Sequence, residues 1–204
     1  MAINLPLIAQ TYYNGQSVSI PEPLTSDFMT GWGAPYNTWP ADSQAQYAYN
    51  PIQAKALLAA AGYANGFTTD IVANQAADLS LLQIVQSMFS SVNFNMSIQV
   101  MASAAFSSYV LTNHQNDALD IKAPNQGDLG LTFYPLRQLM KFQTGGSSND
   151  AVVTAATVNA FYTQALAATS TAQVQAIVTA ANLYVAQHIS LSLYYNLINM
   201  HSIS

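Results

Sequence analysis

The sequence contains no cysteine among its 204 residues, and only 6% of its residues are charged. The absence of cysteine excludes disulfides, thiol nucleophiles and thiolate metal sites. An average soluble domain carries charge on about a quarter of its residues, so asparagine, glutamine, serine and threonine must cover most of this surface. We interpret this composition as an adaptation to an extracytoplasmic setting. The apolar share of 51% is large enough to bury a core, which argues against disorder.

Positive charge is especially scarce. The formal net charge is −5 at pH 7, and the basic residues are scattered along the chain: Lys55, Lys122, Arg137 and Lys141. Four separated cations cannot neutralise a run of phosphates, so the sequence predicts no nucleic-acid partner. An anionic membrane surface is an equally poor partner for the same reason.

The first ten residues, MAINLPLIAQ, lack the basic segment, the long apolar run and the small-residue cleavage site of a secretory signal. No stretch of the sequence reaches the roughly 20 apolar residues that a membrane-spanning helix needs. Two interpretations follow: a cytoplasmic protein, or a fragment that begins downstream of its export signal.

The sequence shows a well-defined helix start at Asn50-Pro51, because asparagine caps free amides and proline suits the first helical position. Leu57, Leu58 and Ala61 are expected on one face, and Gly62 is placed to end the helix. Other helices are predicted near 3–13, 81–92, 104–112, 134–142, 151–168 and 171–187, the last with Ser170 as its cap. Strands are predicted at 67–73, 95–100, 118–121 and 189–195.

Residues 14–50 are rich in proline and glycine and predict a long ordered loop. Elsewhere helices and strands alternate, which predicts an α/β fold in which a layered mixed sheet is flanked by helices. We see no internal repeat, and we expect a single domain over residues 1–204.

Residues 48–67, AYNPIQAKALLAAAGYANGF, resemble the segment Y-D-P-x-x-A-K-x-L-L-x-x-A-G-Y-x-x-G-F of the family 5 bacterial extracellular solute-binding proteins. These proteins serve peptide, nickel and related ABC importers. Weaker similarities lie at residues 2–8, AINLPLI, and in VNAF at 158–161 and LYY at 193–195. An ordinary capped helix would explain Asn50 and Gly62, but not the whole ordered combination of residues.

The resemblance implies one lobe of a type II periplasmic-binding-protein-like fold, in which two lobes enclose a cleft. This sequence would be the second lobe, the first lobe would be missing, and the chain would be a fragment. The implied role is the substrate-binding component of an ABC importer rather than an enzyme. In the full-length protein, which would be periplasmic or a cell-surface lipoprotein, both lobes would share a peptide or similar small solute, and an ABC permease would be the partner. One wall alone should bind weakly, because half of the contacts are absent.

An alternative hypothesis is a stand-alone extracellular interaction or sensor domain derived from such a protein.

In the family, the loop after the third strand faces the ligand, so the resemblance points to Asn125, Gln126 and Asp128 as ligand-binding residues. The segment at 122–128, KAPNQGD, departs from the family pattern W-x-x-D-x-x-D-P, since the tryptophan is absent and no proline follows Asp128. The alternative for Asp128 is a solvated turn or cap residue.

Three aromatic residues of the proline-rich loop, Trp32, Tyr36 and Trp39, are also candidate ligand-binding residues. Their rigid rings suit stacking on a ligand or on the missing lobe. The alternative is that they pack the loop onto its own domain. In an isolated lobe such rings would be partly exposed and would promote self-association.

The three histidines, His114, His188 and His201, are far apart and lack metal-binding spacing, so the sequence predicts no metal site and no cofactor. A hydrolase is a third hypothesis, since Asp117 and Asp120 form a carboxylate pair of the kind used in acid–base catalysis. A turn or strand edge explains that pair as well. No G-x-S-x-G motif is present.

Overall fold

The computed structural model describes residues 1–15, 31–113, 119–121, 136, 139–140, 143–145 and 154–188. The chain forms two compact units. The first contains Met1–Ser19, Ala45–Pro124 and Met200–Ser204, and the second contains Ile20–Gln44 and Asn125–Asn199. We describe each unit separately, and a single domain over residues 1–204 stays a prediction.

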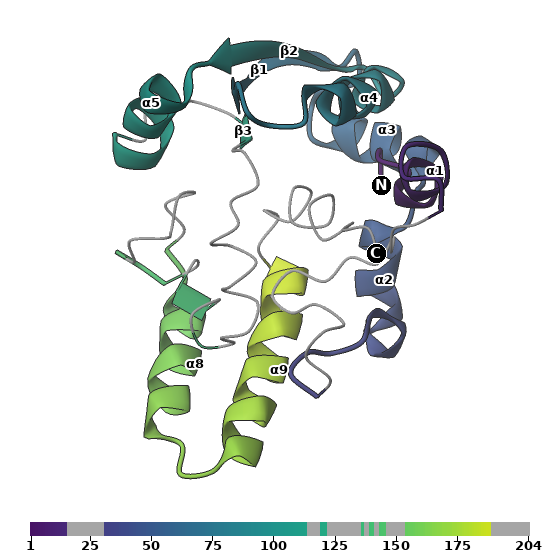
Figure 1. Cartoon of the computed structure of the whole chain (residues 1–204). Helices are drawn as coiled ribbons and strands as arrows, with labels where there is room; N and C mark the ends of the chain where they lie inside the picture. The colour runs from purple at the N-terminus through teal and green to yellow at the C-terminus, as the bar shows by residue number, and fades with distance from the viewer. Residues whose placement is uncertain are drawn as a thin grey trace. The chain divides into compact units, whose positions relative to one another are not determined.

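The first unit is built on a parallel sheet of three strands, β1 (Phe67–Asn74), β2 (Phe94–Met101) and β3 (Leu119–Ile121), in the order β2-β1-β3 (Figure 1). Phe67 pairs with Phe94, and Ile71 pairs with Leu119. The chain therefore moves from β1 to β2 in one direction and from β2 to β3 in the other. Right-handed crossovers then place the two connecting helical segments on opposite faces of the sheet.

The first connection is α4 (Leu79–Ser90), an amphipathic helix that buries Leu81, Leu82, Val85 and Phe89. The ring of Phe89 lies 4.5 Å from that of Phe94 at the start of β2. The second connection is α5 (Ser103–Phe106), which continues into a π-helical segment, η2 (Ser107–Thr112). A small core on this side of the sheet contains Val72, Phe106 and Val110.

Two further helices of the first unit begin as the sequence predicts. In α1 (Leu5–Thr11), proline occupies the first turn, and in α3 (Pro51–Ala60) the Asn50 side chain accepts a hydrogen bond from the Gln53 amide at 3.0 Å. Gly62 follows α3 with a φ of +92°. None of the residues of α3 is buried and Leu57 is 51% exposed, so the face expected to carry Leu57, Leu58 and Ala61 is not part of the described core.

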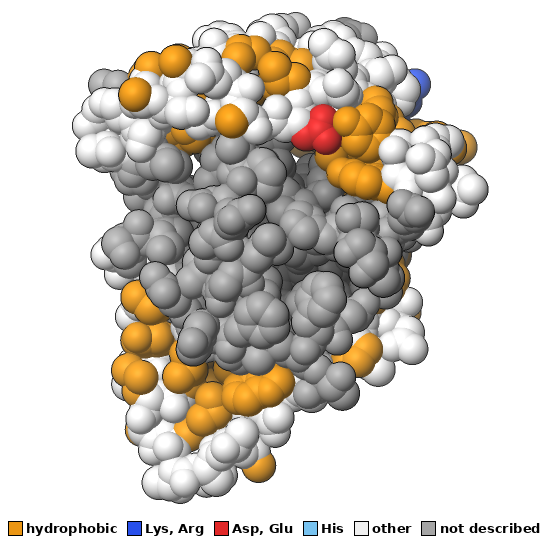
Figure 2. All heavy atoms as spheres, viewed as in Figure 1, with side chains coloured by type: hydrophobic (Ala, Val, Ile, Leu, Met, Phe, Trp, Pro, Cys, Tyr) orange, Lys and Arg blue, Asp and Glu red, His pale blue; other side chains and the backbone are white. Residues whose placement is uncertain are grey.

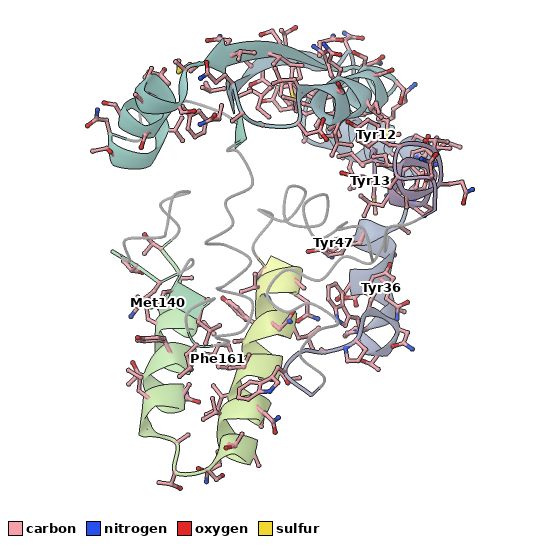
Figure 3. All side chains as sticks on the ribbon, in the orientation of Figure 1. Tyr12, Tyr13, Tyr36, Tyr47, Met140 and Phe161 are labelled. Carbon is pink, nitrogen blue, oxygen red and sulfur yellow. The ribbon has the colours of Figure 1, made fainter. Side chains whose placement is uncertain are left out.

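The second unit contains a short 3₁₀ turn, η1 (Tyr36–Thr38), the start of α2 (Ala41–Tyr47), and the antiparallel pair α8 (Ala156–Ala167) and α9 (Thr171–His188). Figure 1 shows α8 and α9 side by side. Their shared core contains six buried residues: Leu139, Ala155, Val158, Val178, Ala181 and Val185. The ring of Phe161, labelled in Figure 3, contacts that of Tyr184 edge-on with centroids 6.0 Å apart.

Most of the predicted elements are confirmed, and the differences have local causes. The expected loop over 14–50 contains α2 and η1, because Pro40 precedes a helix here and does not interrupt one. The helix predicted at 104–112 changes to π geometry after Phe106, and the helix predicted from 151 begins at Ala156. Ser170 caps α9, since its hydroxyl accepts from the Gln173 amide at 3.3 Å. The strand predicted at 189–195 and most of the helix predicted at 134–142 lie outside the described residues.

Candidate functional site

The carboxyl ends of the three parallel strands lie at one edge of the first unit's sheet. Strand β1 ends at Asn74, β2 at Met101 and β3 at Ile121, and the Gln75 amide donates to the Met101 carbonyl at 2.8 Å. Open α/β sheets bind ligands outside the carboxyl ends of their strands, where the strand order reverses. The order β2-β1-β3 places such a reversal at the end of β1. We call this place, with the turn 74–78, the carboxyl edge.

Asn74 is the polar residue at the centre of the carboxyl edge and is only 8% exposed. Its Oδ1 accepts two hydrogen bonds, from the Ala76 amide at 2.9 Å and from the Ser103 hydroxyl at 3.0 Å. The backbone amide of Ala76 is an obligate donor, so these contacts identify the side-chain oxygen and fix the orientation of the amide group. The two Nδ2 protons therefore point away from both contacts.

A tyrosine pair flanks the same turn. The Tyr12 hydroxyl donates to both carboxylate oxygens of Asp78, at 2.8 and 3.0 Å, while Asp78 caps α4 by accepting from the Leu81 amide. Figure 3 shows Tyr12 beside Tyr13 at the end of α1, and their ring centroids are 5.1 Å apart. Burial, then the charge of Asp78, raises the pKa of Tyr13 to about 12. Burial, followed by the bond to Asp78, also raises the pKa of Tyr12. Both phenols are therefore neutral at neutral pH, and that of Tyr12 donates to Asp78.

The three predicted aromatic residues lie in the second unit. Trp39 is 3% exposed, and its indole N–H donates to the Ala34 carbonyl at 2.7 Å. The Tyr36 ring meets that of Trp39 edge-on at 5.2 Å, and its hydroxyl donates to the Gln44 carbonyl at 2.9 Å. Trp32 is partly buried against the α8–α9 core. These contacts fit the alternative in which the rings pack their own unit, and a role in ligand binding stays a prediction.

The other three predicted residues, Asn125, Gln126 and Asp128, lie outside the described residues. In sequence they follow β3, which ends at the carboxyl edge. Their role in binding a ligand stays a prediction. The sequence argument did not select Asn74 or Ser103. The available signal was the position of Asn74 immediately after the predicted strand at 67–73, where strand-end ligands are expected.

The described surface carries little charge: in Figure 2 the described parts of the face in view are mostly orange or white, with little red or blue. Lys55 is the only lysine or arginine in the described ranges. Within those ranges, no three histidine, aspartate or glutamate side chains gather into a group able to hold a metal ion. No described helix is both long enough and apolar enough to cross a membrane. Among the described side chains, the carboxyl edge offers the amide of Asn74 and the hydroxyl of Ser103, with the carboxylate of Asp78 at the end of the same turn.

Comparison with known proteins identifies the family to which the chain is similar. Residues 1–132 match the model for bacterial extracellular solute-binding proteins, family 5, middle region. No curated protein matches the sequence. Among solved structures, NikA from Staphylococcus aureus in complex with Ni(L-His)2 is 17% identical with a TM-score of 0.72, over 91% of this chain and 38% of that chain.

Two further structures are similar to the same extent. The periplasmic binding protein DppA from Helicobacter pylori, in complex with the peptide STSA, is 18% identical with a TM-score of 0.66, covering 91% of this chain and 35% of that chain. A dipeptide binding protein from Pseudoalteromonas sp., in complex with Met-Leu, is 19% identical with a TM-score of 0.65, covering 91% of this chain and 36% of that chain.

These likenesses confirm the predicted fold, an α/β sheet with flanking helices of the type II periplasmic-binding-protein kind. The chain spans between 35% and 38% of the length of these three structures. Because the family match covers residues 1–132 of 204, more than half of the sequence, the chain belongs to the family 5 bacterial extracellular solute-binding proteins.

Proposed function

We propose that this chain contributes one wall of the solute cleft in the substrate-binding component of an ABC importer. Membership of the family 5 solute-binding proteins is the observation that carries this proposal. Similar structures hold the peptide STSA and the dipeptide Met-Leu, so a peptide or a similar small solute is the expected cargo. The partner of the full-length protein is then an ABC permease, and its setting is extracytoplasmic.

The carboxyl edge is the part of the described structure best suited to face a solute. It lies where open α/β sheets bind ligands, and it offers fixed amide and hydroxyl groups at Asn74 and Ser103. A cleft protein retains its solute by closing two walls around it and expelling water from between them. The chain alone therefore binds a peptide weakly, because it supplies the contacts of one wall.

The proposal assigns no catalytic step to the chain. Turnover of generic ester or glycoside substrates, lost in the Asp128→Ala variant, would overturn this part of the proposal and restore the hydrolase hypothesis. A stand-alone interaction or sensor domain is the alternative. It predicts tight binding to a second protein and no response to any peptide.

The test is a titration of the full chain with Met-Leu and with the peptide STSA, followed by two-dimensional NMR of the ¹⁵N-labelled protein. We expect saturable shifts with a dissociation constant of about 1 mM, equivalent to about −4 kcal/mol. Calorimetry should detect no sub-micromolar binding. The absence of shifts at about ten times that concentration would contradict a solute-binding role, and sub-micromolar affinity would contradict the one-wall argument.

A further inference from the structure

The Asn74 side chain has two N–H donors for which the described part of the chain offers no acceptor. Its oxygen is held from two sides, by the Ala76 amide and the Ser103 hydroxyl. No acceptor for Nδ2 occurs among the described residues, although the side chain is more than nine-tenths buried. Buried polar groups in proteins are almost always paired, so an unused, orientation-fixed donor needs an explanation.

The unpaired donors are not sealed in the core. Among the described residues, the fully buried side-chain atom that lacks a hydrogen-bond partner is Oδ1 of Asn182. Nδ2 of Asn74 also lacks an acceptor there but does not belong to that class, so it keeps some contact with solvent. The small exposed part of this residue therefore includes its donor end, while its acceptor end is covered. A group that arrives from outside at the carboxyl edge can accept from Nδ2 without any rearrangement of the turn.

The surroundings define which kind of group fits. Asp78, four residues along the same turn, caps α4 and keeps its carboxylate beside Tyr12, so an anionic group would meet a like charge there. Lys55, on α3, is the only described lysine or arginine. A neutral oxygen acceptor avoids the repulsion and needs no counter-charge, and a peptide carbonyl is such an acceptor.

We propose that Asn74 is a specificity-determining residue that donates a hydrogen bond from Nδ2 to an uncharged carbonyl oxygen of the solute. This inference rests on the proposed solute-binding function and adds to it the residue and the chemical group that it recognises. Ser103 is a positioning residue, because it holds the Asn74 oxygen and so aims the donor.

The first measurement uses the unmodified chain. The ¹⁵N-labelled protein is titrated with Met-Leu and with N-acetyl-Met-Leu amide, which keeps the carbonyl groups but has no charged ends. Both probes should shift the side-chain amide resonances of Asn74. A shift caused by Met-Leu but not by the blocked probe would overturn recognition of a neutral carbonyl.

Variants then distinguish loss of the Nδ2 donor from disruption of the turn at 74–78. Asn74→Asp retains an oxygen for the Ala76 and Ser103 bonds but removes the Nδ2 donor. Asn95→Asp makes the same change in charge at the opposite end of the sheet, since Asn95 lies at the exposed start of β2. We expect Asn74→Asp to weaken binding of the blocked probe at least tenfold, Ser103→Ala to weaken it two- to fivefold, and Asn95→Asp to leave it unchanged.

The outcomes are distinguishable. If the probes bind but the Asn74 resonances do not move and Asn74→Asp binds normally, the assignment of Asn74 is wrong and the solute-binding function stands. If no probe binds, both proposals fail. If Asn74→Asp does not fold, as judged by its amide dispersion, the resonances of the unmodified chain and the Ser103→Ala variant decide the question.

Discussion

Gly66 is the residue whose substitution gives the sharpest test of the fold. Its φ is +76°, and a Cβ built at this position would lie 1.9 Å from the backbone oxygen of Asn93 and 2.6 Å from its Cβ. Asn93 itself has a φ of +65°, and its carbonyl accepts from the Phe67 amide at 3.2 Å. The contact therefore lies where β1 and β2 begin side by side, and neither backbone can move without disturbing both strands.

The cost of Gly66→Ala has two parts. A left-handed backbone costs an alanine about 1 kcal/mol, which any glycine with positive φ would show. Relief of the contact with Asn93 requires a movement of more than 1 Å, which would break the Phe67–Asn93 hydrogen bond and loosen the adjoining aromatic rings, for about 2–3 kcal/mol more. We expect a total loss of about 3–4 kcal/mol in the free energy of unfolding of the first unit.

Gly62→Ala is the matched control. Gly62 belongs to the same segment and has a φ of +92°, but a Cβ there would meet nothing within 4 Å. Its substitution should cost about 1 kcal/mol, from backbone strain alone. Native-state hydrogen exchange of the β1 and β2 amides measures the first unit directly. Tryptophan fluorescence in urea follows the second unit, since Trp32 and Trp39 both lie there. Equal losses for the two alanine variants, within about 0.5 kcal/mol, would refute the steric argument.

Three further predictions concern other contacts. Asn50→Ala removes the cap of α3 and should lower stability by about 1 kcal/mol in urea unfolding, while Asn50→Asp, which retains the acceptor, should cost less. Ser43 is 1% exposed and accepts from Gln187 Nε2 at 3.0 Å, so Ser43→Ala should destabilise the second unit by about 1–2 kcal/mol, read by tryptophan fluorescence. The raised pKa of Tyr13 means that the fold favours the neutral phenol. Stability should be intact below pH 10 and should fall as the pH rises through the window from 10 to about 12. Two pKa units correspond to about 2.7 kcal/mol, which solvent screening of this half-exposed hydroxyl reduces to about 1 kcal/mol. Thermal melts at pH 8 and pH 11 should show the loss, and Tyr13→Phe should reduce it.

The features that were predicted correctly from the sequence are those determined by residues close together in the chain. The cap at Asn50, the helix end at Gly62 and the Ser170 cap each depend on side chains and backbone angles close in sequence. The strand predicted at 95–100 is likewise confirmed as β2, in which Met96 is buried, Ile98 is partly buried and Val100 is exposed. Local rules are sufficient there because the hydrogen bonds that satisfy each helix end come from the next turn of chain.

The features that were missed depend on distant parts of the chain. The sequence of α3 does not show that all its residues stay unburied, because burial depends on which other elements pack against a helix. The position of Asn74 at a point of reversal follows from the strand order, because only the pairing of β3 with β1 makes the end of β1 such a point. Strand order is a product of long-range pairing, and no spacing within the segment 67–78 encodes it.

The contrast between local and long-range features explains why the sequence indicated the protein family but not the solute. The family segment at 48–67 contains a helix cap, a helix end and a crowded glycine, all of which stabilise the scaffold. These residues act on the backbone of the segment itself, so their roles do not depend on the solute. In the proposed site, the group that selects the solute is the side chain of Asn74 at the end of β1, outside the family segment. Cargo specificity can therefore change while the family segment stays the same, and variants at the carboxyl edge should alter binding of the probes with little effect on the stability that Gly66 controls.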